Sequence, residues 1–218
     1  MQVAVDGPAA SGKSTIAKQT AFALGFTYID TGAMYRAVTL KAIRRKLNLT
    51  VESSFSFVPD TQFQFDHGHI WMDGEDVTHH VRETDISNNV SLVSSYLSVR
   101  EHLVAIQQKM AEHTNVVMDG RDIGTKVLPD ADVKIFLTAS IEERAKRRHL
   151  DNLSRGIASD LDALKEDIAR RDDFDTHRQH SPLMAAQDAI IIDTSHMTID
   201  DVVAHIIEII GEVEKHGV

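Results

Sequence analysis

The stretch Gly7-Pro8-Ala9-Ala10-Ser11-Gly12-Lys13-Ser14 decides the fold of this chain, because it fits the phosphate-binding pattern G-x-x-x-x-G-K-[ST]. Apolar residues at positions 3 and 5 precede the stretch and predict a buried strand. Apolar residues then recur at helical spacing over 16–24. Strand, glycine-rich turn and helix in this order are the context that the motif requires, so we predict that the chain binds a nucleoside triphosphate.

Each part of the loop has a physical task. Glycines at 7 and 12 allow the backbone to curl so that successive N–H groups point at an anion, and the following helix adds the positive end of its dipole. Lys13 is a mobile cation for the β- and γ-phosphates, and the Ser14 hydroxyl is placed to ligate Mg²⁺. The predicted nucleotide-binding residues are Gly7, Pro8, Ala9, Ala10, Ser11, Gly12, Lys13, Ser14 and Thr15. The competing interpretation is a chance glycine turn before an ordinary helix.

Length and composition are those of an ordinary globular protein. The 218 residues suffice for one domain with an insertion, and 42% of them are hydrophobic while 26% are charged. Cysteine is absent, which excludes disulfides and thiolate metal sites. The first strand begins almost at Met1, and no apolar run approaches the ~20 residues of a membrane span. We therefore expect a cytoplasmic protein without a cleavable leader or a membrane partner.

The charge is unevenly distributed. A net charge of −10 argues against a nucleic-acid partner, because such surfaces attract phosphate backbones. Seven of the thirteen arginines nevertheless fall between Arg144 and Arg178. This concentration indicates a local anion, although a solvated helix face laced with ion pairs explains any single arginine as well.

Apolar runs alternate with helical patterns along the rest of the chain. Further strands are predicted at 26–30, 116–118, 133–137 and 189–193. Helices are predicted at 31–47, from 141 onward, in a second segment that ends at 170–171, and in a final helix capped by Thr198 and Asp201. This alternation predicts an α/β fold, a doubly wound five-stranded parallel sheet with helices on both faces. The strand at 26–30 is expected to close a βαβ unit with the first strand.

Residues 48–113 have a different texture. The alternating runs 63–65 and 70–72 predict a small antiparallel hairpin or meander, and a helical stretch follows from 85 to about 113. We interpret 48–113 as an insertion on a core made of 1–47 and 114–218.

Chemically active side chains follow the predicted strands, where ligands bind in sheets of this class. Arg and Asp gather in these segments, which are the P-loop, 30–31, 119–122, the arginine-rich helix and 193–194. The D-x-x-G and N-K-x-D patterns of switch GTPases occur nowhere in the chain. A P-loop kinase for a small acceptor is therefore the better interpretation.

Several longer motifs identify a family. They are Asp6-Gly7-Pro8, Asp30-Thr31-Gly32-Ala33-Met34-Tyr35-Arg36, Asp119-Gly120-Arg121-Asp122-Ile123-Gly124, and Arg171-Asp172-x-x-Asp175-x-x-Arg178 followed by Ser181-Pro182-Leu183. The chain resembles the bacterial cytidylate kinases nearly from end to end. One departure is Thr176, where a serine is expected, and it keeps the hydroxyl. The resemblance implies a nucleoside monophosphate kinase fold, with a small inserted α+β monophosphate-binding subdomain at 48–113 and an arginine-rich lid at about 144–170.

The same resemblance implies an activity and its phosphate-binding residues. The activity is ATP-dependent phosphorylation of CMP and dCMP, with Mg²⁺ as cofactor. The family places Arg36, Arg121 and Arg178 on the acceptor phosphate, and lid arginines among Arg144, Arg147, Arg148 and Arg155 over the transferring group. The catalytic residues implied are Lys13, Arg121, Arg147, Arg148 and Arg178.

Recognition of the cytosine nucleotide is likewise carried over from the family. Asp122 takes the N4 amine, Arg100 takes the acceptor edge of the base, and Ser91 adds a hydroxyl contact. The sugar is assigned to Arg171 and Asp175, and Thr31 is a further substrate-binding residue. Uracil would turn O4 toward the Asp122 carboxylate, so UMP is expected to be a poor substrate. Without the family, Arg100 and Ser91 read as helix-surface residues, and Asp122 reads as a local cap or a partner of Arg121.

The chemistry of the residues agrees with a phosphate acceptor. Such an acceptor is already nucleophilic near neutral pH, so the barrier is the repulsion between two anions, which a dense set of cations in a dry site offsets. Alternatives are a kinase for another nucleoside monophosphate or for a small hydroxyl acceptor, and a nucleotide-binding regulatory module. Asp119 is either an outer-sphere Mg²⁺ partner or a strand-end cap, and His177-x-x-His180 is interpreted as incidental. We expect a monomer.

Overall fold

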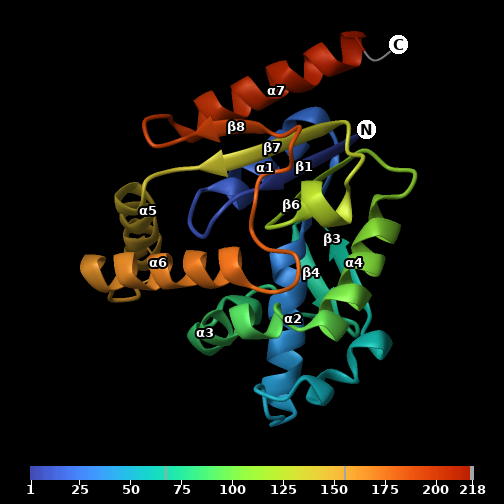
Figure 1. Ribbon diagram of the computed structural model, residues 1–218, viewed down its shortest axis with the longest axis vertical. Coiled ribbons are helices and arrows are strands. Elements are labelled where there is room, and N and C mark those ends of the chain that lie inside the picture. The colour runs from blue at the N-terminus through green and yellow to red at the C-terminus, as the bar shows by residue number, and fades with distance from the viewer. Residues whose placement is uncertain (67, 155, 217–218) are drawn as a thin grey trace. The chain divides into compact units, whose positions relative to one another are not determined.

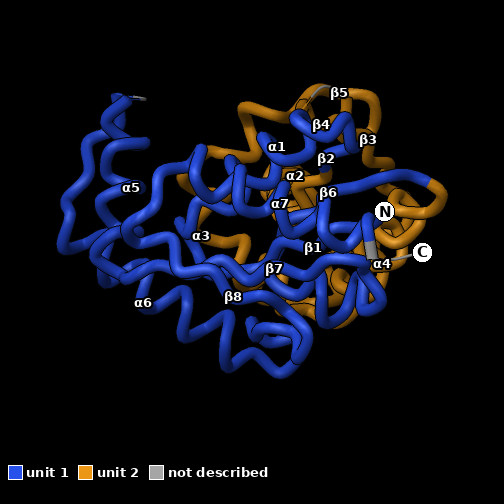
Figure 2. The backbone as a smooth tube through the Cα atoms, turned by 90° about the horizontal axis from the view of Figure 1, so that it is seen from above, with its two compact units in different colours: residues 1–28, 114–218 blue, residues 29–113 orange. Residues whose placement is uncertain are grey.

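The computed structural model describes residues 1–66, 68–154 and 156–216. The chain divides into two compact units, one made of residues 1–28 and 114–218 and the other of residues 29–113 (Figure 2). Each unit has its own buried apolar core. The second unit begins earlier than the insertion predicted from 48, because helix α2 (Thr31–Arg44) packs against the helices of that unit.

The first unit contains the parallel sheet. Its elements are β1 (Gln2–Asp6), α1 (Lys13–Leu24), β6 (Val116–Gly120), the π-helical turn η4 (Ile123–Val127), β7 (Val133–Thr138), α5 (Ile141–Ser154), α6 (Leu161–His177), β8 (Ile190–Asp193) and α7 (Ile199–His216). The strand order is β2-β6-β1-β7-β8, in which β2 spans Thr27–Asp30. Figure 1 labels β6, β1, β7 and β8. The pairs β1–β6, β1–β7 and β7–β8 are parallel, as the sequence predicts.

One predicted pairing is wrong. We expected the second strand to close a βαβ unit with β1, but β6 lies between them. All five residues of β6 are buried, whereas β2 carries exposed and half-buried residues. The uniformly buried strand β6 therefore occupies the inside of the sheet and β2 its edge.

The core of the first unit explains why its helices form where they do. Val3 and Val5 of β1 pack with Ile135 of β7 and with the apolar stripes of α1 and α7. The Thr198 and Asp201 side chains cap the start of α7 reciprocally, as predicted. Helices α5 and α6 pack against each other. Helix α6 continues to His177, beyond the predicted end at 170–171, because no glycine or proline interrupts the chain between 157 and 181.

The second unit is a mixed α+β body. Its elements are α2, the short turns η1 (Glu52–Phe55), η2 (Val58–Asp60) and η3 (His80–Arg82), the strands β3 (Phe63–Asp66), β4 (His69–Met72) and β5 (Glu75–Asp76), and the helices α3 (Thr84–Val93) and α4 (Leu97–Ala111). The strands form the predicted antiparallel meander.

The predicted helical stretch from 85 to 113 is two helices. It breaks after α3, where the Ser94 hydroxyl donates to the carbonyl of Ser91 and the Ser95 hydroxyl donates to the carbonyl of Leu92. Serine hydroxyls that bond local carbonyls compete with helix continuation. The periodicity of the apolar residues runs across this break, which is why the sequence alone predicts one helix.

Candidate active site

The P-loop has the backbone that its glycines predict. Gly7 has φ of +153°, and a Cβ built there would lie 2.2 Å from the carbonyl oxygen of Leu137. Gly12 has φ of +87°, and Ala10 between them also has a positive φ, of 58°. Residues of alternating backbone hand turn successive N–H groups into an anion-binding concavity. Lys13 at its end is buried, and its Nζ donates to the carbonyl of Pro8 at 3.2 Å.

The Ser14 hydroxyl belongs to a chain of three side chains. It donates to Oδ2 of Asp119 at 2.7 Å, and the Tyr28 hydroxyl donates to Oδ1 of the same carboxylate at 2.8 Å. Asp119 is buried at the end of β6. A serine hydroxyl beside a carboxylate is a set of hard oxygen donors, which suits Mg²⁺. Of the two roles considered for Asp119, this geometry favours a metal-associated role over a strand-end cap.

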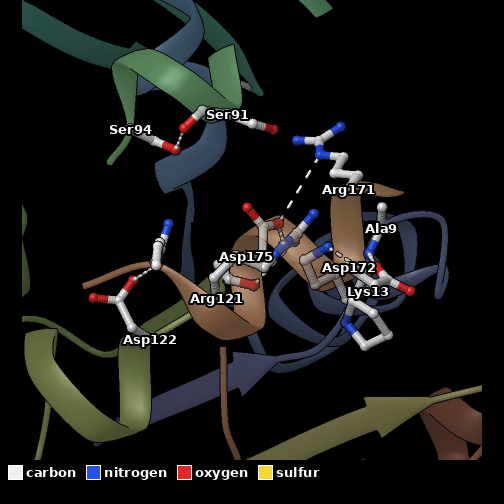
Figure 3. A network of polar contacts seen from close by, with 12 residues as sticks. Ala9, Lys13, Ser91, Ser94, Arg121, Asp122, Arg171, Asp172 and Asp175 are labelled. Atoms are coloured by element: carbon white, nitrogen blue, oxygen red, sulfur yellow. Dashed lines mark hydrogen bonds and ion pairs between the residues drawn. The ribbon is translucent and has the colours of Figure 1, made fainter. Parts of the chain in front are cut away.

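Helix α5 is anchored to the P-loop by its first arginine. Buried Arg144 donates to the carbonyl of Ala9 at 3.0 Å, to the carbonyl of Ala139 at 2.9 Å, and to Asp172 at 2.5 Å. Asp172 also accepts from the backbone N–H of Ala9, at 3.3 Å (Figure 3). Arg144 therefore holds both arginine-rich helices against the loop that is expected to bind phosphate.

The remaining predicted lid arginines differ in their surroundings. Arg147 donates to the carbonyl of Ser11 at 3.3 Å and to both oxygens of Thr194 at 2.9 and 2.6 Å. The Arg148 side chain is 42% exposed and lies 4.0 Å from Asp151. Arg155 lies outside the described residues. Arg147 is thus placed at the P-loop, and Arg148 is the more accessible guanidinium.

Asp175 gathers two predicted substrate-binding arginines. Its Oδ2 accepts from Nε of Arg121 at 3.1 Å and lies 4.0 Å from Nε of Arg171 (Figure 3). The carboxylate is buried, so its charge is balanced by these guanidiniums. Desolvation, followed by repulsion from Arg121, lowers the pKa of Arg171 to about 10. Arg171 remains protonated at neutral pH, and an additional anion would be attracted to this group of cations.

Asp122 and Arg178 form a second buried pair. Nη2 of Arg178 lies 3.6 Å from Oδ1 of Asp122, and Nε of Arg178 donates to the carbonyl of Ser181 at 2.7 Å. Asp122 makes no side-chain cap to the turn η4 that follows it. The local-cap interpretation of Asp122 is therefore wrong, and the carboxylate faces the arginine instead.

The second unit holds the other predicted substrate-binding residues. Thr31 is buried at the start of α2, and Arg36 on the same helix donates to the Ser87 hydroxyl at 2.9 Å. Arg100 is buried, stands 5.4 Å over the Tyr35 ring, and donates to the carbonyl of Ser94 at 3.0 Å.

Ser91 is joined to Arg100 through Ser94, because the Ser94 hydroxyl donates to the Ser91 carbonyl (Figure 3). The interpretation of Arg100 as a helix-surface residue is wrong, since only 3% of it is exposed. Ser91 is half-buried.

Sequence reasoning missed several residues of this arrangement. Four residues make a hydrogen bond to a predicted site residue or to the segment that carries one, namely Asp6, Asp172, Ser87 and Thr194. The signal for Asp6 and Asp172 was available, because both stand inside the motifs that identify the family. Thr194 lies in the segment 193–194 that follows a predicted strand, which was a weaker signal, and Ser87 carries none. Among the incidental histidines, the His177 ring lies 3.0 Å from Asp173, and His67 is outside the described residues.

Comparisons with known proteins agree on one family. The family model described as cytidylate kinase matches residues 3–212. A cytidylate kinase of Geobacillus sp. is 51% identical over 217 residues, which are 97% of this chain and 97% of that protein. A cytidylate kinase of Acholeplasma laidlawii is 51% identical over 209 residues, which are 96% of this chain and 94% of that protein.

Solved structures support the fold at much lower identity. A gluconokinase from Sinorhizobium meliloti is 14% identical, with a TM-score of 0.52, over 99% of this chain and 94% of that chain. A shikimate kinase from Bacteroides thetaiotaomicron is 15% identical, with a TM-score of 0.50, over 97% of this chain and 98% of that chain. Within the described residues, no helix meets the length and apolarity needed to span a bilayer.

Proposed function

The chain belongs to the cytidylate kinase family, and from this premise we propose that it transfers the γ-phosphoryl group of ATP to CMP and dCMP, giving CDP and dCDP. The observation that carries the proposal is the 51% identity to a cytidylate kinase over 97% of the chain. The enzyme is a phosphotransferase whose acceptor is itself a phosphate group.

The reaction is a direct in-line displacement. An oxygen of the CMP phosphate forms a bond to the γ-phosphorus, and the bond from that phosphorus to the β,γ-bridging oxygen breaks, so that ADP leaves with the electron pair. The acceptor is mostly dianionic near neutral pH and needs no general base. The barrier is therefore the approach of two anions, which cations in a water-poor site make possible.

The arginines and Lys13 supply those cations. Lys13 and the P-loop N–H groups bind the β- and γ-phosphates of ATP, and Arg147 and Arg148 stabilise the charge on the group in transfer. Arg121 and Arg178 bind the acceptor phosphate, and we assign Arg36 to the same phosphate. Two contacts support this assignment: Asp175 accepts a hydrogen bond from Arg121, and Arg178 donates to the carbonyl of Ser181 while its charge lies near Asp122.

The hydroxyl of Ser14 and the carboxylate of Asp119 are the residues that would hold Mg²⁺. Their donor atoms are 2.7 Å apart and are both oxygens. The ion, when bound, neutralises charge on the β- and γ-phosphates. Tyr28 orients the Asp119 carboxylate from its other side.

Selection of cytosine follows from the pattern of donors and acceptors. The Asp122 carboxylate accepts from the N4 amine, and Arg100 with Ser91 serves the acceptor edge. Arg171 and Asp175 bind the sugar hydroxyls, and Thr31 contributes to acceptor binding. UMP is a poor substrate because its O4 would face the Asp122 carboxylate without a proton between them.

The proposal is tested by ADP release from the purified chain, coupled to NADH oxidation, with CMP, dCMP, UMP, AMP and GMP as acceptors. We expect CMP and dCMP to support rapid ADP formation, and UMP, AMP and GMP to support little. A preference for AMP or GMP contradicts the assigned acceptor, and transfer to an alcohol such as shikimate or gluconate would indicate a hydroxyl kinase. ATP binding without turnover of any acceptor would indicate a regulatory module.

We further propose that a single chain is sufficient for catalysis and that it works in the cytoplasm. Sedimentation at assay concentrations, combined with activity that is proportional to protein concentration, tests the monomer directly.

A further inference from the structure

Asp6 is a buried carboxylate that the proposed mechanism does not use. It is the last residue of β1, directly before the P-loop, and only 4% of it is exposed. Its two oxygens do not bond the P-loop N–H groups. Oδ1 accepts from the backbone N–H of Ile123 and Oδ2 accepts from the backbone N–H of Gly124, both at 2.8 Å.

These two N–H groups begin the turn η4, which directly follows Asp122. The first N–H groups of a helical turn lack partners within the turn, and an aspartate at the preceding position is the residue that ordinarily caps them. Asp122 stands at that position but makes no cap. The cap comes instead from Asp6, more than a hundred residues earlier in the chain.

The capping of the turn by Asp6 rather than by Asp122 affects where the Asp122 side chain lies. Because Asp6 satisfies the N–H groups of the turn, the Asp122 side chain is released from local capping and faces Arg178, 3.6 Å away. Both ends of the arrangement are fixed, since β1 and β6 pair in parallel with Asp6 opposite Gly120.

We propose that Asp6 is a positioning residue for specificity: by capping the turn at 123–124 it holds the Asp122 carboxylate where it can read the amine of a cytosine ring. The proposal rests on the proposed function, because it takes Asp122 as the base-reading group. The proposal also links the two substrate sites, because Asp6 directly precedes the P-loop and at the same time bonds the turn that follows Asp122.

The surroundings of Asp6 make its carboxylate costly to ionise. Burial raises the pKa of Asp6 to about 7 against the lowering effect of its two backbone hydrogen bonds, with Asp122 raising it and Lys13 lowering it further. Lys134 of β7 packs its aliphatic stem near Gly124, and its amine pairs with Asp188. Burial makes this carboxylate costly to ionise, and its two hydrogen bonds to the turn offset part of that cost.

The first test is Asp6→Asn, which keeps the size but replaces one acceptor oxygen by a donor that faces an N–H group. We expect KM for CMP to rise about ten-fold and the ratio of kcat/KM for CMP to that for UMP to fall similarly, with a smaller change in KM for ATP. Asp201→Asn is the matched control, because Asp201 caps the exposed start of α7. This variant is expected to leave the KM values for CMP and ATP unchanged. An equal rise in KM for ATP and CMP, or an unchanged CMP-to-UMP ratio, overturns the proposal.

A double-mutant cycle separates positioning from a general structural effect. If Asp6 acts through Asp122, adding Asp6→Asn to an Asp122→Asn chain changes the CMP-to-UMP ratio no further. Full additivity of the two changes in that ratio overturns the proposal. Asp6→Glu provides a second variant, which keeps the charge but displaces the turn, and it is expected to lower the same ratio.

A pH readout uses the same variant. In the unfolded chain Asp6 has its ordinary pKa of 3.8, whereas in the folded protein its pKa is about 7. Between these two pH values the folded protein therefore holds a proton that the unfolded chain has lost. The stability that this proton confers is present at low pH and is lost as the pH rises through that window. As the pH rises to about 7, the Tm of the wild type is therefore expected to fall relative to the Tm of Asp6→Asn. Above about pH 7 the difference between the two Tm values is expected to stay constant. A difference independent of pH contradicts the buried ionisation of Asp6.

The two proposals fail in distinguishable ways. If wild type does not phosphorylate CMP, the proposed function fails before any variant is made. If wild type prefers CMP and Asp6→Asn keeps the same preference, only the role of Asp6 fails.

Discussion

Five arginines that the sequence assigns to the site or the lid have different described contacts in the two units. In the first unit Arg121, Arg144 and Arg178 each lie against a buried or half-buried carboxylate. In the second unit Arg36 bonds a serine hydroxyl, and Arg100 bonds a backbone carbonyl over an aromatic ring. A carboxylate that accepts from a guanidinium orients it more firmly than a neutral oxygen does and also offsets its charge.

This difference suits two different tasks. Residues that must stabilise a transition state need fixed positions, because misplacement by about 1 Å can cost ~100-fold in rate. Residues that bind the acceptor without touching the reacting bond need charge and shape, but tolerate small displacements. We therefore expect substitution of Arg121 or Arg178 in the first unit to affect mainly kcat, and substitution of Arg100 or of the Ser87 partner of Arg36 in the second unit to affect mainly KM.

The largest effect is expected for Arg121→Ala. Loss of a guanidinium on the acceptor phosphate removes stabilisation of the transition state, and we expect kcat to fall by about 10³. The measurement is steady-state ADP release at saturating CMP, with Arg170→Ala as the control, because Arg170 is exposed and pairs only locally with Asp167. A change confined to KM would mean that the two units do not divide the work in this way.

Asp122→Asn ranks second and sharpens the question of specificity. Replacing the carboxylate by an amide removes one acceptor for the cytosine amine and adds a donor for uracil O4. We expect kcat/KM for CMP to fall about 100-fold, while activity toward UMP rises relative to it. Side-by-side kinetics with CMP and UMP test the exchange, and an unchanged preference would show that Asp122 does not read the base.

Asp175→Asn tests whether the carboxylate matters as an orienting group. The neutral amide keeps the shape but no longer neutralises Arg121 and Arg171, so we expect about a ten-fold loss in kcat/KM. The loss should be larger for CMP than for dCMP if Asp175 also bonds the sugar hydroxyl. Wild-type values for both nucleotides contradict the orienting role.

The smallest effect is expected for Ser87→Ala in the second unit. The hydroxyl makes one neutral hydrogen bond to Arg36, and its loss is worth about 1 kcal/mol, or roughly five-fold in KM for CMP. We expect kcat to be unchanged. A fall in kcat as large as that of Asp175→Asn would remove the distinction between the two units.

The sequence predicts the first unit better than the second, for physical reasons. The P-loop pattern constrains the strand, the backbone of the turn and the helix together, and the structure shows β1, positive φ angles at Gly7 and Gly12, and α1 in this order. The break between α3 and α4 was missed because serine capping at Ser94 leaves the apolar period intact.

Local sequence patterns also do not predict a helix cap that comes from a distant part of the chain. Asp122 precedes a turn and looks like its cap, yet Asp6 supplies the cap through tertiary structure. Arg144 and Arg148 have similar sequence neighbourhoods, but Arg144 is buried against the P-loop whereas 42% of the Arg148 side chain is exposed. Both arginines lie on α5, so the difference depends on which face of that helix packs against the P-loop, and helical spacing alone does not determine this.

The most direct test of the central claim is chemical rescue of Arg121→Ala. The claim is that a positive charge at this place allows two anions to meet, so guanidinium chloride at concentrations below those that unfold the protein should restore part of the lost kcat with CMP, while an equal concentration of sodium chloride should not. Restoration specific to guanidinium is the predicted result. Wild-type kcat in the unrescued variant would contradict the account.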